Sequence, residues 1–325
     1  MLNRKNAALF SVLTVTLTSE AWAQETWDMA LAYPSSNYHS ELASDFASMV
    51  NENQDEINIT THPGGSLYGG GQIYSSTRRG LVPLGERFIS ALSNEDAIFG
   101  IDAIPFLATN FDEAKALYEA SKPKMQEVLE ANNLKLLYSV PWPPQGLYVN
   151  NEINSIEDMQ GVRFRAFDPT TERVAELMGA TPTSIEAADL TQAFATGVAE
   201  SMFGSGSTAY DSKLWEHVDY WYDIGAWLPK NMVIVNLDMW NALRQDTRDV
   251  VLATAADIER QGWEKAIELD GWYKEQLADN GMGIMDASDQ LEADFEAIGE
   301  QMLQDWLDRS GEYGEEIIST YRGES

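Results

Sequence analysis

The chain has 325 residues, of which 21 are Lys or Arg and 52 are Asp or Glu, so its formal net charge at pH 7 is −31. An electrostatic field of this sign repels nucleic acids and anionic lipid head groups, which argues against both as partners. Cysteine is absent, which excludes disulfides, thiolate metal sites and a cysteine nucleophile.

Residues 1–23 have the pattern of a secretory signal peptide. Arg4 and Lys5 precede a mostly apolar segment, residues 7–18, and Ala-Trp-Ala at 21–23 is a small-x-small cleavage pattern. A buried N-terminal helix is the alternative. Cleavage near Ala23 would leave 19 basic and 51 acidic residues, a charge of −32, and would place the mature protein in the periplasm. No other segment approaches the ~18 uninterrupted apolar residues of a membrane span, so we expect no direct membrane insertion.

The acidic excess is spread along the chain rather than gathered in a tail. This distribution suggests a solvated acidic surface and, as a hypothesis, a halophilic or marine source. A mature chain of about 300 residues suffices for one large or two medium domains.

The first half of the chain alternates strand-like and helical patterns. An alternating run over 25–33 predicts a first strand. Further strands are predicted at 56–60, 81–90, 100–104 and 134–140, with helices at 38–51, in a short segment ending at 79–80, and at 111–131, the last with a break near Pro123.

The alternation resumes with strands at 162–167, 198–203 and 232–237 and helices at 169–178 and 188–196. A proline-free helical pattern then runs over 246–280, which at 1.5 Å per residue is about 50 Å, and its simplest use is to span two lobes. Two more helices are predicted in the last forty residues. The sequence therefore predicts an α/β fold of two lobes, with mostly parallel strands and a ligand cleft between the lobes.

Signs of catalysis or of a cofactor are missing from the sequence. The histidines at 39, 62 and 217 do not pair at a metal-ligand spacing, and there is no GxSxG pattern. The glycines at 69–71 lack the following Lys-Ser/Thr of a phosphate loop. We expect neither a metal nor a cofactor.

Aromatic side chains beside prolines are the first candidates for a binding site. Tyr33, Trp142 and Trp227 lie next to Pro or one residue from it, in predicted loops at strand ends. Aromatic rings in such places can wall a pocket, because they exclude water around a small solute. The alternative is that each ring completes the hydrophobic core.

Arg165 is the sharper candidate. It lies in the apolar run GVRFRAFDPTT of residues 161–171, two residues after Arg163. A buried guanidinium needs a partner, and its planar fork suits a carboxylate. That partner is either a ligand or an internal acid. Arg163 is expected on the surface or in an internal ion pair.

Residues 155–201 resemble the signature region of the periplasmic solute-binding proteins of TRAP transporters, the DctP-type family. The segment IDAIPFL at 101–107 and the run at 236–243 extend the resemblance over nearly the whole mature chain. The matching positions in the signature region are Asp158, Gly161, Arg165, Gly179, Ala180, Pro182, Ala193 and Gly197.

This resemblance implies a two-lobed periplasmic binding protein fold, with crossing hinge strands and a long helix bridging both lobes. The implied division is 24–147 with 239–279 for lobe I and 148–238 with 280–325 for lobe II. It also implies closure on a small organic solute, usually an acid held by Arg165, and delivery to the small and large membrane subunits of a permease.

The sequence departs from the family pattern around the expected pocket floor. Glu200-Ser201 replaces Asp-Gly, the segment FGSGST at 203–208 replaces an Asn-Pro-type segment, and Asp189 stands where Glu is frequent. The pocket floor near Phe203, Ser205 and Thr208 is therefore expected to differ from the common acid site.

Two acids leave a second ligand class open. If Glu86 and Asp168 face the cleft, a small amine, amino alcohol or zwitterion would suit them, with Trp142 and Trp227 as cation–π walls. The same carboxylate pair is the basis of a rival enzyme hypothesis, a periplasmic hydrolase or isomerase. The predicted binding residues are Arg165, Glu86, Trp142, Asp168, Phe203, Ser205, Trp227, Asn231, Tyr33 and Asn37.

Overall fold

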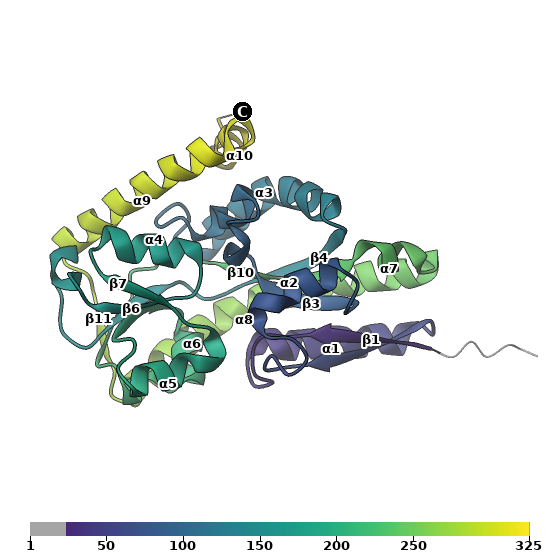
Figure 1. Cartoon of the computed structure of the whole chain (residues 1–325), viewed down its shortest axis with the longest axis horizontal. Helices are drawn as coiled ribbons and strands as arrows, with labels where there is room; N and C mark the ends of the chain where they lie inside the picture. The colour runs from purple at the N-terminus through teal and green to yellow at the C-terminus, as the bar shows by residue number, and fades with distance from the viewer. Residues whose placement is uncertain (1–23, 325) are drawn as a thin grey trace, which may run out of the picture.

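Two β-sheets organise residues 24–324, the part of the chain that the computed structural model describes (Figure 1). The predicted signal peptide lies outside these residues. The first sheet has the order β2-β1-β3-β10-β4 and the second β11-β9-β5-β8-β6-β7. The prediction of an α/β chain with two lobes is confirmed.

The strands of the first sheet are β1 (Glu25–Ala30), β2 (Ile57–His62), β3 (Leu84–Phe88), β4 (Leu134–Pro141) and β10 (Lys230–Asn236). Its neighbours β2, β1 and β3 are parallel, whereas β10 runs antiparallel between β3 and β4. Every residue of β10 is buried, which is why its central residues 232–235 are all apolar.

The strands of the second sheet are β5 (Gly146–Val149), β6 (Arg163–Ala166), β7 (Thr181–Ser184), β8 (Ser201–Gly204), β9 (Tyr220–Tyr222) and β11 (Gly283–Met285). Here β7, β6 and β8 are parallel, and β5 joins this group to β9 by antiparallel pairing. Both sheets therefore contain a parallel half, whose carboxyl ends are a frequent place for a ligand.

Helices cover the faces of both sheets. The α-helices are α1 (Tyr38–Asn53), α2 (Gly70–Arg78), α3 (Phe111–Ala131), α4 (Pro169–Leu177), α5 (Leu190–Ala195), α6 (Gly206–Asp211), α7 (Leu237–Ala242), α8 (Gln245–Asp279), α9 (Asp289–Ser310) and α10 (Glu312–Arg322). Short 3₁₀ helices are η1 (Ser90–Leu92), η2 (Ala97–Ala103), η3 (Ile156–Met159), η4 (Ala187–Asp189) and η5 (Leu214–Glu216).

Two extended segments cross between the sheets side by side. The chain passes from β4 to β5 through residues 142–145 and returns from β9 to β10 through residues 223–229. Backbone hydrogen bonds join the two segments, from Trp142 N–H to the carbonyl of Pro229 at 2.8 Å and from Gln145 N–H to that of Trp227 at 2.9 Å. The two connections thus form one paired strip between the lobes.

The long helix α8 contacts elements of both sheets. It packs on α1 and β4 in the first lobe and on α6 and β11 in the second. Gly262 permits the close approach to β4, since an added Cβ would lie 2.5 Å from Cγ2 of Val140. After α8 the chain continues through α9, and α10 returns to pack on α3 (Figure 1).

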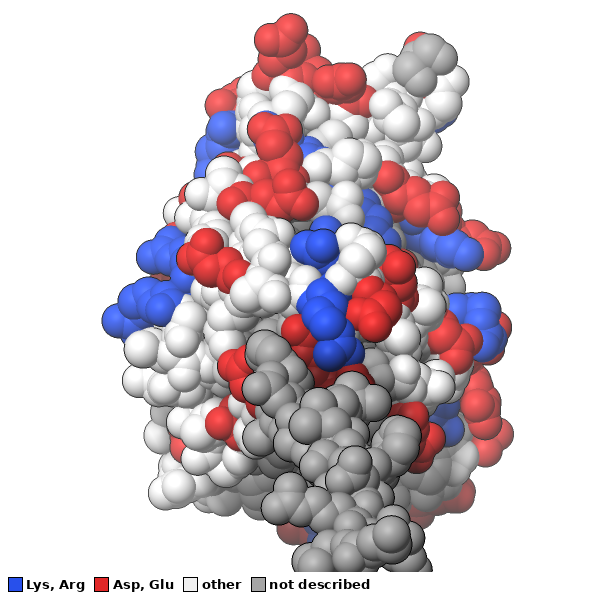
Figure 2. Space-filling model, turned by 90° about the vertical axis from the view of Figure 1, so that its right-hand side faces the viewer, with Lys and Arg blue, Asp and Glu red and all other residues white. Residues whose placement is uncertain are grey.

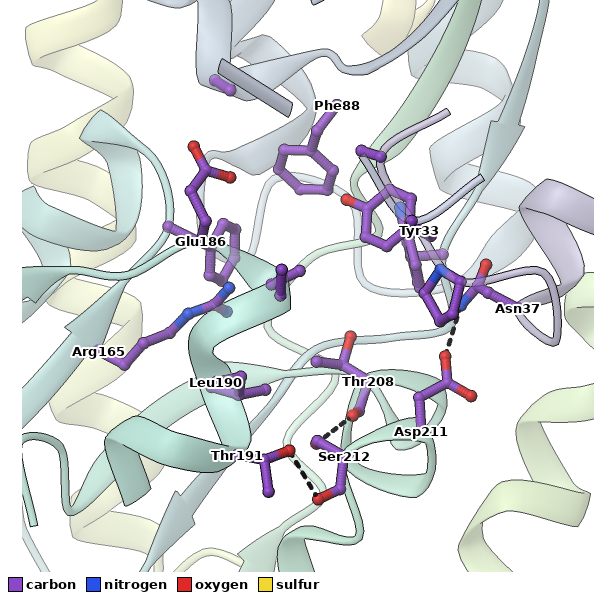
Figure 3. Close-up of a pocket in the computed structure, with 18 of the residues that line it drawn as sticks. Tyr33, Asn37, Phe88, Arg165, Glu186, Leu190, Thr191, Thr208, Asp211 and Ser212 are labelled. Carbon is purple, nitrogen blue, oxygen red and sulfur yellow. Dashed lines mark hydrogen bonds between the residues drawn. The ribbon is translucent and has the colours of Figure 1, made fainter. Parts of the chain in front are cut away.

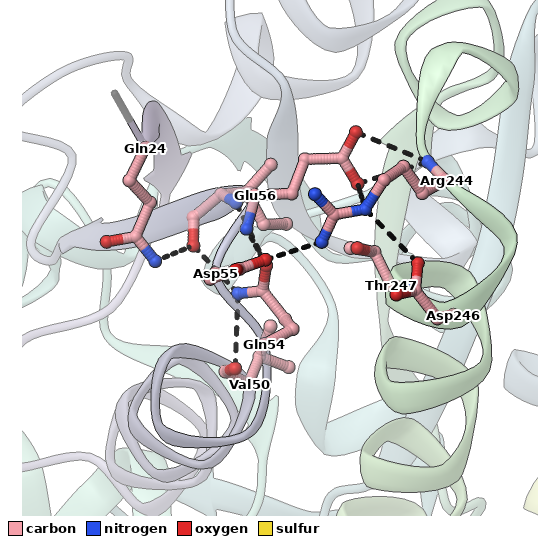
Figure 4. Close-up of polar contacts among 9 residues, drawn as sticks. Gln24, Val50, Gln54, Asp55, Glu56, Arg244, Asp246 and Thr247 are labelled. Atoms are coloured by element: carbon pink, nitrogen blue, oxygen red, sulfur yellow. Dashed lines mark hydrogen bonds and ion pairs between the residues drawn. The ribbon is translucent and has the colours of Figure 1, made fainter. Parts of the chain in front are cut away.

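The N-terminus of α8 is fixed to the first lobe by charged side chains (Figure 4). Arg244 pairs with Asp55 and, at 3.2 Å, with Asp246, while its backbone N–H donates to the carboxylate of Glu56 at 3.0 Å. Asp55 and Asp246 are largely exposed, Arg244 is about half exposed and Glu56 is partly buried. Figure 2 shows acidic and basic side chains interspersed over the face near the N-terminus rather than separated into blocks.

Three features differ from the elements predicted from the sequence. Pro123 lies inside the continuous helix α3; it is exposed, as is Glu119, so the carbonyl that loses its partner faces water. The segment predicted as a strand at 100–104 belongs mainly to η2, a fully buried 3₁₀ helix. The strand β10 lies in the first sheet, although residues 148–238 were assigned to lobe II.

Candidate functional site

A cavity of about 350 Å³ lies between the two lobes. Its walls come mainly from segments after the carboxyl ends of parallel strands, β1, β2 and β3 on one side and β6 and β7 on the other. The lining residues are Ala32, Tyr33, Pro34, Asn37, Gly64, Arg87, Phe88, Ala91, Trp142, Gln145, Arg165, Phe167, Glu186, Ala187, Ala188, Leu190, Thr191, Thr208, Asp211 and Ser212.

Arg165 projects from β6 into this cavity (Figure 3). Its side chain is almost fully buried, and its Nε donates to the carbonyl of Ile185 at 3.0 Å. Within residues 24–324 no carboxylate oxygen lies within 4.0 Å of its nitrogens. Burial lowers the pKa of Arg165 to about 10, which leaves the guanidinium charged at neutral pH. The two Nη groups of a buried cation are thus available to an anion in the cavity.

Further polar groups surround the same space. Glu186 and Asp211 bring carboxylates from the second lobe, and Arg87 brings a second cation from β3. The hydroxyl groups of Tyr33 and Thr208 point toward the middle of the cavity in Figure 3. Burial is the main cause that raises the pKa of Tyr33, so this residue stays a neutral phenol that can donate a hydrogen bond.

Aromatic rings form the apolar part of the wall. Trp142 and Tyr33 meet with ring centroids 4.8 Å apart, and Phe88 meets Phe167 edge-on at 5.4 Å. The guanidinium carbon of Arg165 lies 4.6 Å from the centroid of the Phe167 ring, a cation–π contact that holds the fork without neutralising it.

Hydrogen bonds join the two lobes on either side of the cavity. Asn37, the N-cap of α1, donates through Nδ2 to Oδ2 of Asp211 at the end of α6, at 2.7 Å. Burial raises the pKa of Asp211, and the bond from Asn37 opposes that shift. Ser90 of η1 donates to Asp168 at the start of α4. The lobes are therefore in direct contact beside the cavity.

The structure places the predicted binding residues in two groups. Tyr33, Asn37, Trp142 and Arg165 line the cavity, as does Thr208. Six others do not line it: Glu86, Asp168, Phe203, Ser205, Trp227 and Asn231.

Glu86 and Asp168 differ from their predicted orientation for separate reasons. Glu86 is buried on the face of β3 that is covered by α1, where it accepts a hydrogen bond from Asn231 at 3.1 Å. Asp168 is the N-cap of α4 and forms a capping box with Thr171. Neither carboxylate reaches the cavity, so they do not supply the amine site predicted for them.

The remaining predicted residues have structural roles. Phe203 and Trp227 pack together in the core of the second lobe, with centroids 4.9 Å apart. Ser205 caps α6 by accepting from the backbone N–H of Thr208 at 3.2 Å. Arg163 lies on the surface, the first of its two predicted alternatives, and there it pairs with Glu200.

The sequence analysis missed several lining residues. Phe88 and Phe167 follow the same rule as Tyr33, because they stand at the carboxyl ends of predicted strands, and this signal was available. Glu186 follows the four-residue β7 and Asp211 ends the six-residue α6. Neither element was predicted, so no pattern marked these two acids.

Two features are absent from residues 24–324. No group of three or more His, Cys, Asp or Glu side chains is arranged to hold a metal ion. No helix in that range combines the length and the apolar character needed to cross a bilayer.

Comparisons with known proteins agree with this geometry. The model of bacterial extracellular solute-binding protein family 7, the DctP family, matches residues 30–309. DctP6, a Bordetella pertussis extracytoplasmic solute receptor binding pyroglutamic acid, is 40% identical; the match covers 92% of this chain and 99% of that one, with a TM-score of 0.90.

Two further relatives differ in the solute that they bind. A marine metagenome TRAP solute-binding protein specific for pyroglutamate is 41% identical, with 93% and 100% coverage and a TM-score of 0.91. The ectoine/5-hydroxyectoine-binding periplasmic protein UehA of Ruegeria pomeroyi is 21% identical over 319 residues, 92% of this chain and 90% of that one.

Proposed function

Since the chain belongs to bacterial extracellular solute-binding protein family 7, whose relatives are TRAP receptors and not enzymes, we propose that it captures a small carboxylic acid of the pyroglutamate type. The acid lies in the cavity between the lobes, with its carboxylate on Arg165. The loaded receptor then delivers the solute to the two integral membrane subunits of a TRAP permease.

The observation that carries the proposal is the state of Arg165. It is a buried cation that lines the cavity and has no ion-pair partner among residues 24–324. Leaving a buried charge unpaired costs several kcal/mol, and a carboxylate that enters the cavity removes this cost. A bidentate pair with the guanidinium fork also fixes the orientation of the acid.

The other charged groups favour an acid that also carries a hydrogen-bond donor. Glu186 and Asp211 can accept from an N–H group, and Arg87 can donate to a carbonyl. Pyroglutamate has these groups, because its ring is a lactam with one N–H and one C=O. Two relatives of about 40% identity bind pyroglutamate, which supports the same class of ligand here.

Calorimetric titration of the mature protein with L-pyroglutamate tests the proposal. We expect binding of L-pyroglutamate and none of 2-pyrrolidinone, which keeps the lactam but lacks the carboxylate. L-Proline and ectoine provide the comparison with a zwitterion that has no lactam.

Two matched variants test the role of the arginine. Arg165→Met removes the buried cation and should abolish binding of L-pyroglutamate. Arg163→Met removes the exposed arginine on the same strand and should leave the affinity unchanged. Equal binding of 2-pyrrolidinone, or intact binding by Arg165→Met, would contradict the assignment.

A further inference from the structure

A chain of three buried side chains lies behind the wall of the cavity. The indole Nε1 of Trp142 donates to Oδ1 of Asn231 at 2.9 Å, and Nδ2 of Asn231 donates to Oε1 of Glu86 at 3.1 Å. The three residues are 3%, 2% and 2% exposed, respectively. Of the three, only Trp142 lines the cavity.

The chemistry of the indole fixes the direction of this chain. An indole N–H is a donor only, so Asn231 must present its amide oxygen to Trp142 and its amide nitrogen to Glu86. Glu86 must then accept. The sheet supports this order, because Glu86 is paired in register with Val233, two residues from Asn231, which places both side chains on one face.

Trp142 needs such a fixed partner because its ring meets several others. The ring lies 4.1 Å from the centroid of His39 and 4.8 Å from that of Tyr33. Aromatic contacts tolerate several orientations, whereas the single N–H of the indole is aligned by one acceptor. The orientation of the cavity wall therefore depends on Asn231.

We propose that Glu86 is a positioning residue of the solute site: through Asn231 it holds the indole of Trp142 in the orientation that closes the cavity. The effect of Glu86 on solute affinity rests on the proposed function. The effect of Glu86 on the orientation of the indole does not. Glu86 acts on Trp142 and does not touch the solute.

The surroundings of Glu86 are neutral. Nδ1 of His39, on α1, lies 3.7 Å from Oε1 of Glu86, and burial lowers the pKa of this histidine well below its usual range. Burial raises the pKa values of the phenols of Tyr33, Tyr38 and Tyr138, and the charge of Glu86 adds to each shift, so these groups stay neutral. Within residues 24–324 no Lys or Arg pairs with Glu86, so its hydrogen bond with Asn231 is what ties it to the site.

Reversing the donor and the acceptor between positions 86 and 231 tests this chain of hydrogen bonds. Asn231→Asp keeps an acceptor for Trp142 but sets two carboxyl groups face to face, which at pH 8.5 repel or must share a proton. Adding Glu86→Gln to this variant restores one donor and one acceptor between positions 86 and 231. Glu86→Gln alone keeps an acceptor for Asn231 and serves as the control.

The first readout is made without solute. The indole N–H resonance of Trp142, assigned with Trp142→Phe, should shift and exchange faster with D₂O in Asn231→Asp. The resonance should return to its original position in the double variant and should not shift in Glu86→Gln. If Asn231→Asp lowers only the melting temperature and leaves the indole resonance unchanged, the positioning role is wrong.

The second readout is the affinity for L-pyroglutamate at pH 8.5. We expect Asn231→Asp to bind about tenfold more weakly and the double variant to bind within about threefold of the unaltered protein. A double variant no better than the single one overturns the proposal. If the unaltered protein does not bind L-pyroglutamate, the proposed function fails, and the indole readout still decides the role of Glu86.

Discussion

Replacing Glu86 with Gln should change how the stability of the protein depends on pH. Burial raises the pKa of this carboxyl from 4.5 to about 7, and the hydrogen bond from Asn231 opposes part of the shift. Between these two values the folded protein keeps a proton that the unfolded chain has lost. Stability therefore falls as pH rises through this window and becomes level above the folded pKa.

The size of the effect follows from the shift. At about 1.36 kcal/mol per pKa unit, ionisation of Glu86 removes ~3 kcal/mol of folding free energy by the time the pH exceeds 7. Most of that loss, about 2–3 kcal/mol, accumulates between pH 5 and pH 8. Glutamine cannot ionise and keeps the acceptor for Asn231, so Glu86→Gln should lack this loss.

Urea unfolding of the solute-free protein at pH 5, 6, 7 and 8 measures this pH dependence of stability. The free energy of unfolding of Glu86→Gln minus that of the unaltered protein should increase by about 2–3 kcal/mol over the range. The control is Glu127→Gln, at an exposed position of α3, whose difference should stay flat.

Two results would refute the reasoning. If the free energy of unfolding of Glu86→Gln minus that of the unaltered protein does not change with pH, Glu86 ionises with an ordinary pKa. A decreasing difference would mean that His39 carries a proton and forms an ion pair with Glu86, since an ion pair lowers the pKa of the acid and stabilises the folded protein at higher pH.

Two further predictions concern packing and closure. Gly262→Ala in α8 should lower the free energy of unfolding by ~1–3 kcal/mol, because its Cβ meets Val140 at 2.5 Å. Gly271→Ala, in the same helix with no atom within 4 Å, should raise it by up to ~1 kcal/mol; equal effects in urea unfolding would contradict the packing argument. Asn37→Ser keeps a capping hydroxyl for α1 but is too short to reach Asp211, so the solute should dissociate about tenfold faster in stopped-flow experiments, and an unchanged rate would mean that this bond does not hold the lobes together.

The helices were predictable wherever the chain shows one apolar face over several turns. The spacing of apolar residues predicted α1 and α8 to within a few residues of their ends. The strands β9 and β11 have only three residues each, too few for an alternation to be recognised. The fully buried η2 has no polar face to set a period, which explains why it resembled a strand.

The wrong placement of Asp168 in the candidate site was avoidable. The sequence Asp168-Pro169 followed by Thr171 is the pattern of an N-cap, a proline in the first turn and a capping partner. It predicts a helix start and not a ligand contact. For Glu86 the alternation of β3 gives two faces, but only the packing of α1 on the sheet decides which face is buried.

The contrast between two buried cations gives the strongest argument for the charge of the solute. Lys230 is 1% exposed, and its Nζ lies 3.5 Å from Oδ2 of Asp102, so the fold compensates this charge with an acid of its own. Arg165 is about as deeply buried, but among residues 24–324 no acid forms an ion pair with it. The chain carries 52 acidic residues, so many acids could have been placed beside Arg165. That no acid among residues 24–324 forms an ion pair with it, at the wall of a cavity, is therefore informative. A buried cation without an ion-pair partner favours the closed form only when an anion is inside the cavity, and we infer that the group which we propose to hold the acid also links its capture to closure of the lobes.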